Sequence, residues 1–235
     1  MNRIENMCGR FTIISNPLVY QLEFDLQVDP GKIIHWDSRY NVSPTRQVPV
    51  VKNSLERSPD LMQWGLVPGW VKDEKHKFRL INVRAETIAE KTFSKRLLQQ
   101  GKCCSILADG FYEWQAAGQK GPSKTPFYFY LKEHKPFAFA GLWDAWETPD
   151  GQMVESCAII TCAPNAMVSP VHDRMPVILD RETSWQWISP RPIPQLLSLL
   201  KPYPASEMVS YPVNSSVNNP AVDSEECLSP AGNNP

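Results

Sequence analysis

The stretch KCCSILADGFYEWQ, residues 102–115, decides the fold. The runs 102–108 and 110–115 lie on either side of Asp109. Apolar runs rich in aromatic and β-branched residues, broken by Asp, Gly or Pro, are typical of strands. We therefore expect two consecutive strands at the centre of the chain.

Similar runs on both sides extend this pattern into a whole domain. Further strands are predicted at 46–53, 60–68, 125–132, 136–147 and 155–163. Helices are predicted at 16–24, 85–101, 184–188 and 192–200. The helix over 85–101 has apolar residues at helical spacing, with Gly101 as its C-terminal stop. The fold class is therefore α+β: a single mixed domain with a mostly antiparallel, barrel-like β core and peripheral helices.

Composition and charge restrict the function only weakly. The chain has 235 residues and a formal net charge of −1, which neither indicates nor excludes nucleic acid as a partner. Residues 72–102 hold nine Lys or Arg against four Asp or Glu. That stretch could bind a polyanion, but charge alone favours a solvated, salt-bridged helix face. After residue 213 the chain is rich in Asn, Ser and Pro, so we expect a loosely held tail.

The sequence gives no support for a membrane-spanning, secreted, disulfide-linked or metal-binding protein. No apolar run reaches the roughly 18 residues of a membrane span, and no secretion signal is visible. We therefore expect a cytoplasmic protein, nucleoid-associated in a bacterium, with no membrane partner. The six cysteines form no CxxC pair, and no histidines are spaced near them as ligands. Reduced thiols and no metal are expected.

Glu113 is the first candidate for chemistry. In GFYEWQ, strand alternation places Phe111, Glu113 and Gln115 on one face. If that face is buried, the pKa of the carboxyl rises and Glu113 can shuttle protons near neutral pH. If the face is solvated, Glu113 is an ordinary surface residue, and the rarity of buried glutamate favours this alternative.

Four further residues each carry two interpretations. His172, in PVHDRMP, can exchange protons near pH 7 or lie in a surface loop. Asn82 and Arg84, in LINVRAET, can cap the next helix, or can orient a neighbouring group and hold a phosphate. Trp70 follows a Pro-Gly turn and is expected to be exposed, where it could stack on a nucleobase. Trp64 is expected in the core.

Seven ordered motifs are more specific than any of these residues alone. They are MCGRF, RYNVSPT, WGLVPGW, NVRAET, ADGFYEW, GLWDAW and HDRMPVIL. In this order they resemble the SRAP family of abasic-site sensors, first catalogued as SOS-response-associated peptidases. The resemblance implies an N-terminal extension over 1–7, a family domain over 8–220 and a polar C-terminal tail over 221–235.

The resemblance also implies a reaction. In that family an N-terminal cysteine reacts with an abasic site in single-stranded DNA to give a thiazolidine, a ring that needs both an α-amine and a thiol. Cys8 then matches the nucleophile, Glu113 the acid/base, His172 the histidine that acts on the sugar oxygen, and Asn82 the residue that positions the cysteine. Schiff-base chemistry at the same sugar implies β-elimination, and therefore lyase activity, as a secondary reaction.

Five residues match DNA contacts of the family. Arg10 and Arg84 resemble phosphate anchors, Trp70 a stacking platform, and Asn41 and Thr161 secondary backbone contacts. The implied partners are single-stranded DNA containing abasic sites and replication-associated proteins. A monomer without a cofactor is expected.

The N-terminus departs from the family pattern, because MNRIEN precedes Met7. Translation could begin at Met7, the protein could remove the extension itself, or the extension could persist and leave Cys8 without an amine. Two other functions therefore stay open. One is a cysteine peptidase or autopeptidase that uses Cys8 and His172. The other is a single-stranded DNA-binding module without catalysis.

Overall fold

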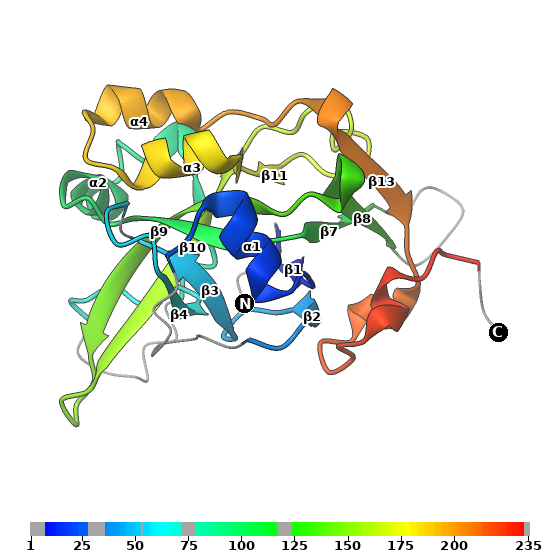
Figure 1. Ribbon diagram of the computed structural model, residues 1–235, viewed down its shortest axis with the longest axis horizontal. Helices are drawn as coiled ribbons and strands as arrows, with labels where there is room; N and C mark the ends of the chain where they lie inside the picture. Colours follow the sequence, from blue (N-terminus) through cyan, green and yellow to red (C-terminus); the bar gives the residue numbers. More distant parts are fainter. Residues whose placement is uncertain (1–7, 28–35, 53, 72–78, 117–123, 233–235) are drawn as a thin grey trace.

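The computed structural model describes residues 8–27, 36–52, 54–71, 79–116 and 124–232 (Figure 1). The extension over 1–7, part of the basic stretch at 72–78 and the end of the tail at 233–235 lie outside the described residues. The expected α+β fold with a mostly antiparallel core is confirmed.

Five strands close on themselves to form a barrel. In order around the barrel they are β10 (Met153–Cys162), β4 (Pro59–Trp64), β3 (Gln47–Val51), β6 (Cys103–Ala108) and β9 (Phe137–Glu147), which pairs again with β10. Neighbours in this ring are antiparallel except β10 and β4, which are parallel. The barrel-like core expected from the sequence is therefore present.

Three short strands extend this sheet beyond the barrel. They are β5 (Asn82–Arg84), which is parallel to β10, and β11 (Met175–Pro176) and β12 (Ile178–Leu179), which are antiparallel to β10 and β9. Strand β4 is shorter than the predicted 60–68, because it ends at Trp64 and Gly65 follows with a φ of 120°.

A second, antiparallel sheet lies beside the barrel. Its order is β13 (Met208–Pro212), β8 (Thr125–Leu131), β7 (Gly110–Gln115), β1 (Arg10–Ile13) and β2 (Arg39–Val42). The chain crosses from the barrel strand β6 into β7 at Asp109. This buried carboxylate accepts hydrogen bonds from the backbone N–H groups of Ile14 and Ser15 and from the Tyr20 hydroxyl. The opening stretch therefore joins both sheets.

Four α-helices lie at the periphery: α1 (Pro17–Phe24), α2 (Thr92–Gln99), α3 (Arg181–Ile188) and α4 (Ile193–Leu199). Helices α2, α3 and α4 gather on one side of the molecule, and α3 packs on β6 and β9 (Figure 1). Helices α1, α3 and α4 were expected from the sequence, whereas α2 covers only the second half of the helix predicted at 85–101. None of the helices in the described part of the chain is long and apolar enough to cross a membrane.

The prediction of one helix over 85–101 is wrong. A short 3-10 turn, Ala85–Thr87, is followed by α2, and Lys91 between them is extended with φ −71° and ψ 124°. The Ser94 hydroxyl stabilises the break because it donates to the carbonyl of Ile88. Gly101 does end the helix, since it adopts a φ of 67° and Lys102 N–H donates to the Leu97 carbonyl.

Residues 213–232, which we call the C-terminal segment, are not loosely held, so that expectation is wrong for them. Their short 3-10 helices, Ser215–Asn218 and Glu225–Leu228, lie on the side of the molecule opposite α4 (Figure 1). Val213, Val217 and Cys227 are buried in a cluster with Tyr112 and Tyr128. Two further 3-10 turns, Lys132–His134 and Ala205–Glu207, complete the described elements.

Candidate active site

Cys8 and Glu113 meet where the first strand begins. Strand β1 pairs antiparallel with β7, with Arg10 opposite Tyr112, so the residue before β1 reaches the Glu113 side chain. The Cys8 backbone N–H donates to Glu113 Oε1 at 2.8 Å, and the Cys8 thiol lies near enough to this carboxylate for its charge to act on the thiol. Cys8 is 3% exposed and has a φ of 42°, a strained conformation for a residue other than glycine.

The burial of this pair sets its protonation. Burial raises the pKa of Glu113 above its usual value, with His172 opposing that shift. Burial also raises the pKa of the Cys8 thiol well above its usual range, and the Glu113 charge adds to this effect. The thiol is therefore protonated at neutral pH and faces a carboxylate with increased basicity. Because Glu113 is fully buried, the surface interpretation of this residue is wrong.

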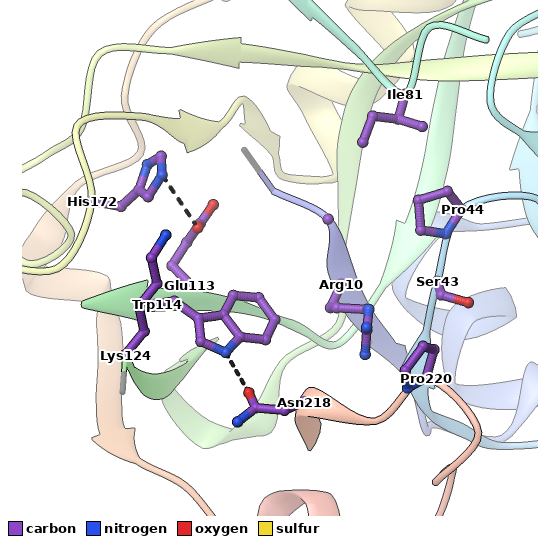
Figure 2. A pocket seen from close by; sticks show the side chains of 11 residues that line it. Arg10, Ser43, Pro44, Ile81, Glu113, Trp114, Lys124, His172, Asn218 and Pro220 are labelled. Atoms are coloured by element: carbon purple, nitrogen blue, oxygen red, sulfur yellow. Dashed lines mark hydrogen bonds and ion pairs between the residues drawn. The ribbon is translucent and has the colours of Figure 1, made fainter. Parts of the chain in front are cut away.

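His172 completes the constellation. Its Nε2 lies 3.8 Å from Glu113 Oε2 (Figure 2), and its Nδ1 accepts a hydrogen bond from the Arg174 backbone N–H at 3.1 Å. Nδ1 also lies 3.2 Å from Asp173 Oδ1, and Nε2 is the ring nitrogen that faces Glu113. The sequence alone did not decide between a site and a loop, and the structure brings His172 to Glu113.

A cavity of about 540 Å³ opens beside these residues (Figure 2). Its walls come from seven separate parts of the chain and include Gly9, Arg10, Ser43, Glu113, His172 and Pro220. A volume of this size is typical of sites that bind small molecules or parts of larger ones. Glu113 lines the cavity, and Cys8 directly precedes the lining residue Gly9, so the pair lies beside it.

The C-terminal segment forms one wall of the cavity, which was not predicted from the sequence. Asn218 and Pro220 line the cavity, and Trp114 Nε1 donates to Asn218 Oδ1 at 2.7 Å (Figure 2). The indole of Trp114 is thereby fixed in the wall beside Glu113. The only feature of the sequence that indicated a role for these residues was the resemblance to the family, which extends to about residue 220.

Arg10 and Asn41 hold that wall in place. Arg10 Nη1 donates to Asn41 Oδ1 and to the Val217 carbonyl, each at 2.8 Å. Asn41 is 3% exposed, and its Nδ2 donates to the carbonyls of Val217, Asn219 and Val222. Arg10 also lines the cavity, so a DNA contact by Arg10 stays a prediction that its position allows. A DNA contact by the buried Asn41 is likewise a prediction.

The other predicted residues lie on β5 and β10. Asn82 pairs with Ile159 and Arg84 with Thr161 across the parallel strands. Arg84, and not Asn82, precedes the 3-10 turn, and it makes no side-chain cap, so the capping interpretation is wrong. Thr161 is buried, and its carbonyl accepts a hydrogen bond from Arg174. Arg84 is exposed. The roles assigned to these three residues stay predictions.

The exposure of Trp70 and the burial of Trp64 agree with the predictions from the sequence. Trp70 is 57% exposed, whereas Trp64 is fully buried. Within the described residues, no three His, Cys, Asp or Glu side chains lie close enough together to hold a metal ion.

Fold and site together define a β-barrel protein in which a buried cysteine, a glutamate and a histidine meet at one cavity. Residues 7–220 match the family model described as SOS response associated peptidase (SRAP). The chain belongs to this family.

Named relatives share most of the chain. It is 40% identical over 228 residues to the abasic site processing protein YoqW of Bacillus subtilis, covering 94% of this chain and 99% of the relative. It is 32% identical to the abasic site processing protein HMCES of Xenopus tropicalis, covering 80% of this chain and 65% of the relative. A crystal structure of a Bacteroides thetaiotaomicron protein superposes with a TM-score of 0.84 at 27% identity, covering 95% of this chain and 100% of the other.

Proposed function

We propose that this protein recognises abasic sites in single-stranded DNA and links to them covalently through a thiazolidine formed by Cys8. The observation that carries the proposal is the hydrogen bond from the Cys8 nitrogen to the buried carboxylate of Glu113, whose charge also acts on the thiol of the same residue. Family membership and relatives named abasic site processing proteins support it.

The chemistry joins two bonds at one carbon. An abasic deoxyribose opens to an aldehyde at C1′, and the Cys8 α-amine attacks that carbon. A C–N bond forms, and the aldehyde oxygen leaves as water to give a Schiff base. The thiol then adds to the same carbon, forming the C–S bond, while its proton passes to the nitrogen. The net change is the loss of one water, and ring closure is fast because it is intramolecular.

Glu113 and His172 move the protons of this sequence. Glu113 accepts a hydrogen bond from the Cys8 nitrogen, and its charge acts on the Cys8 thiol, so it can take a proton from one group and return it to the other. His172 directs its Nε2 toward the same carboxylate and lines the cavity, where it can exchange a proton with the sugar oxygen as the ring opens. Asn82 orients the cysteine in this scheme, and Arg10, Asn41, Arg84, Thr161 and Trp70 contact the strand.

The reacting form begins at Cys8, because an internal cysteine has no α-amine. An α-amine has a pKa of about 7.7–8.0, so a useful fraction is neutral near pH 7. Before ring closure the Schiff base can also undergo β-elimination, so slow strand cleavage is part of the proposal.

The experiment is adduct formation with a synthetic single-stranded oligonucleotide that carries one abasic site, followed by a denaturing gel. Cys8→Ala should abolish the adduct, whereas Cys103→Ala, at a buried cysteine outside this cavity, should leave it unchanged. Glu113→Gln should slow adduct formation far more than it weakens DNA binding. An adduct that survives Cys8→Ala would overturn the proposal.

Blocking the α-amine while sparing the thiol separates this reaction from peptidase chemistry, which needs only the thiol. Loss of the adduct after blocking supports the thiazolidine. Equal binding of intact and abasic strands, with no adduct at all, would favour the non-catalytic DNA-binding module.

A further inference from the structure

The turn that carries Trp70 combines an exposed ring with a fixed backbone. Residues 68–71 form a turn closed by a hydrogen bond from Val71 N–H to the Pro68 carbonyl at 3.0 Å. Pro68 and Val71 are buried, whereas Trp70 is 57% exposed. The backbone beneath the exposed ring is held by hydrogen bonds from several sides.

Asp144, in strand β9, is the main support. Its Oδ2 accepts a hydrogen bond from the Gly69 N–H at 2.9 Å, and its side chain is only 2% exposed. The carboxylate is neutralised by two cations, since Lys102 Nζ lies 2.5 Å from Oδ1 and Arg96 Nη2 lies 3.3 Å from Oδ2. Through this one carboxylate the turn is connected to two cations and to strand β9.

Two further contacts fix the flanks of the turn. Trp146 Nε1 donates to the Val71 carbonyl, and Val67 N–H donates to the Ser156 hydroxyl oxygen at 2.8 Å. The turn also lies directly on β9, because a Cβ atom at Gly69 would come within 2.6 Å of the Ala145 carbonyl oxygen. Only glycine allows this close approach without a shift of the backbone.

These contacts agree with the salt-bridged interpretation of the basic stretch over 72–102. Two of its cations, Arg96 and Lys102, are used internally on Asp144. Lys102 Nζ also lies 5.3 Å from the centre of the Trp143 ring. The two cations therefore support the turn rather than stand free for phosphate groups.

We propose that Asp144 is a positioning residue that presents Trp70 to a base of single-stranded DNA. The inference rests on the DNA binding in the proposed function, but not on the covalent chemistry at Cys8. A ring that is already fixed loses little conformational freedom when a base stacks on it, so more of the stacking free energy contributes to affinity.

The proposal and simple electrostatics predict opposite effects of Asp144→Asn on DNA affinity. Asp144→Asn removes one negative charge, and a more positive protein should bind DNA more tightly. Loss of the support for Trp70 should instead weaken binding, by roughly tenfold. Asp60→Asn is the matched control, because Asp60 is a half-exposed partner of Lys52 and does not touch the turn. This variant should bind DNA as tightly as the original protein or more tightly.

The test is a double-mutant cycle read by fluorescence anisotropy with an undamaged oligo-dT strand. Asp144→Asn and Trp70→Ala should each raise the dissociation constant, and Asp144→Asn should add less than a twofold change in the Trp70→Ala background. The rate of adduct formation at saturating abasic DNA should not change in Asp144→Asn. Tighter binding by Asp144→Asn, an equal loss in both backgrounds, or a slower saturated rate would overturn the proposal.

Gly69→Ala is the second variant, and it keeps the test decisive if Asp144→Asn does not fold. It displaces the turn from β9 without touching any charge, and it should weaken binding to a similar extent. Binding that is unchanged in a folded Gly69→Ala protein would overturn the proposal. The failure of the covalent reaction would appear separately, as an absent adduct alongside an intact coupling between Asp144 and Trp70.

Discussion

Replacement of Glu113 by Gln should stabilise the protein while it impairs the reaction. Glu113 is fully buried, and burial is the largest cause of its raised pKa. Folding therefore favours the protonated acid over the carboxylate. Each unit by which the native pKa exceeds the unfolded value costs about 1.4 kcal/mol of stability once the pH is above both values. Glutamine is neutral and keeps an oxygen that can accept the Cys8 N–H.

The sign of the pH dependence follows from the same shift. Below about pH 4 Glu113 is protonated in both the folded and the unfolded chain, so Glu and Gln should be nearly equal in stability. As the pH rises through the raised pKa, the protein with Glu113 loses stability and the Gln variant does not. Near neutral pH we expect the variant to be the more stable protein, and each kcal/mol that it gains to raise Tm by about 2–4 °C in a protein of this size.

The assay is thermal unfolding followed by circular dichroism across this pH range, with residues 1–7 retained. In a chain that begins at Cys8, the α-ammonium group would stabilise the carboxylate and reduce the gain. Asp109→Asn is the contrasting buried acid, because its carboxylate accepts bonds from Ile14, Ser15 and Tyr20. That variant should lose stability. A lower Tm for Glu113→Gln, or a difference that does not change with pH, would refute the reasoning.

Three further predictions concern the strand contacts, the cavity wall and the histidine. Arg84→Ala should weaken binding to single-stranded DNA and reduce the salt dependence of the affinity by about one phosphate contact. The measurement is a binding titration at several salt concentrations, and an unchanged slope of log affinity against log salt concentration would exclude a phosphate contact by Arg84. Asn41→Ala removes three hydrogen bonds to the C-terminal segment and should cost roughly 2–4 kcal/mol of local stability. The loss should appear as faster proteolysis within 213–232, and equal cleavage rates in the variant and the original protein would contradict this role. His172→Gln should slow adduct formation with little change in DNA affinity, and an unaltered single-turnover rate would remove it from the chemistry.

The parts of the fold that depend on neighbouring residues were predictable from the sequence. Strand alternation and turn residues predicted β6 and β7 in the opening stretch, and Gly101 marked the end of α2. The apolar spacing over 85–101 could not separate one helix from a 3-10 turn followed by a helix. That choice depends on local backbone bonds such as the one from Ser94 to Ile88.

The parts that depend on distant residues were not predictable from local patterns. The burial of Glu113 requires Cys8, which lies 105 residues away along the chain. The order in the C-terminal segment requires Asn41, whose amide reaches carbonyls between 176 and 181 residues away. A polar composition indicates exposed chain on average, but it does not show which backbone carbonyls a buried amide will satisfy. The resemblance to the SRAP family supplied the site residues, and the local periodicity did not.

Intact-mass spectrometry of the adduct tests the central claim most directly. The protein is incubated with an abasic single-stranded oligonucleotide, and the adduct and the unreacted protein are weighed. The account predicts an adduct whose protein portion begins at Cys8, with a total mass equal to protein plus oligonucleotide minus one water. An adduct that still contains residues 1–7 would contradict it, as would a protein that begins at Cys8 and forms no adduct.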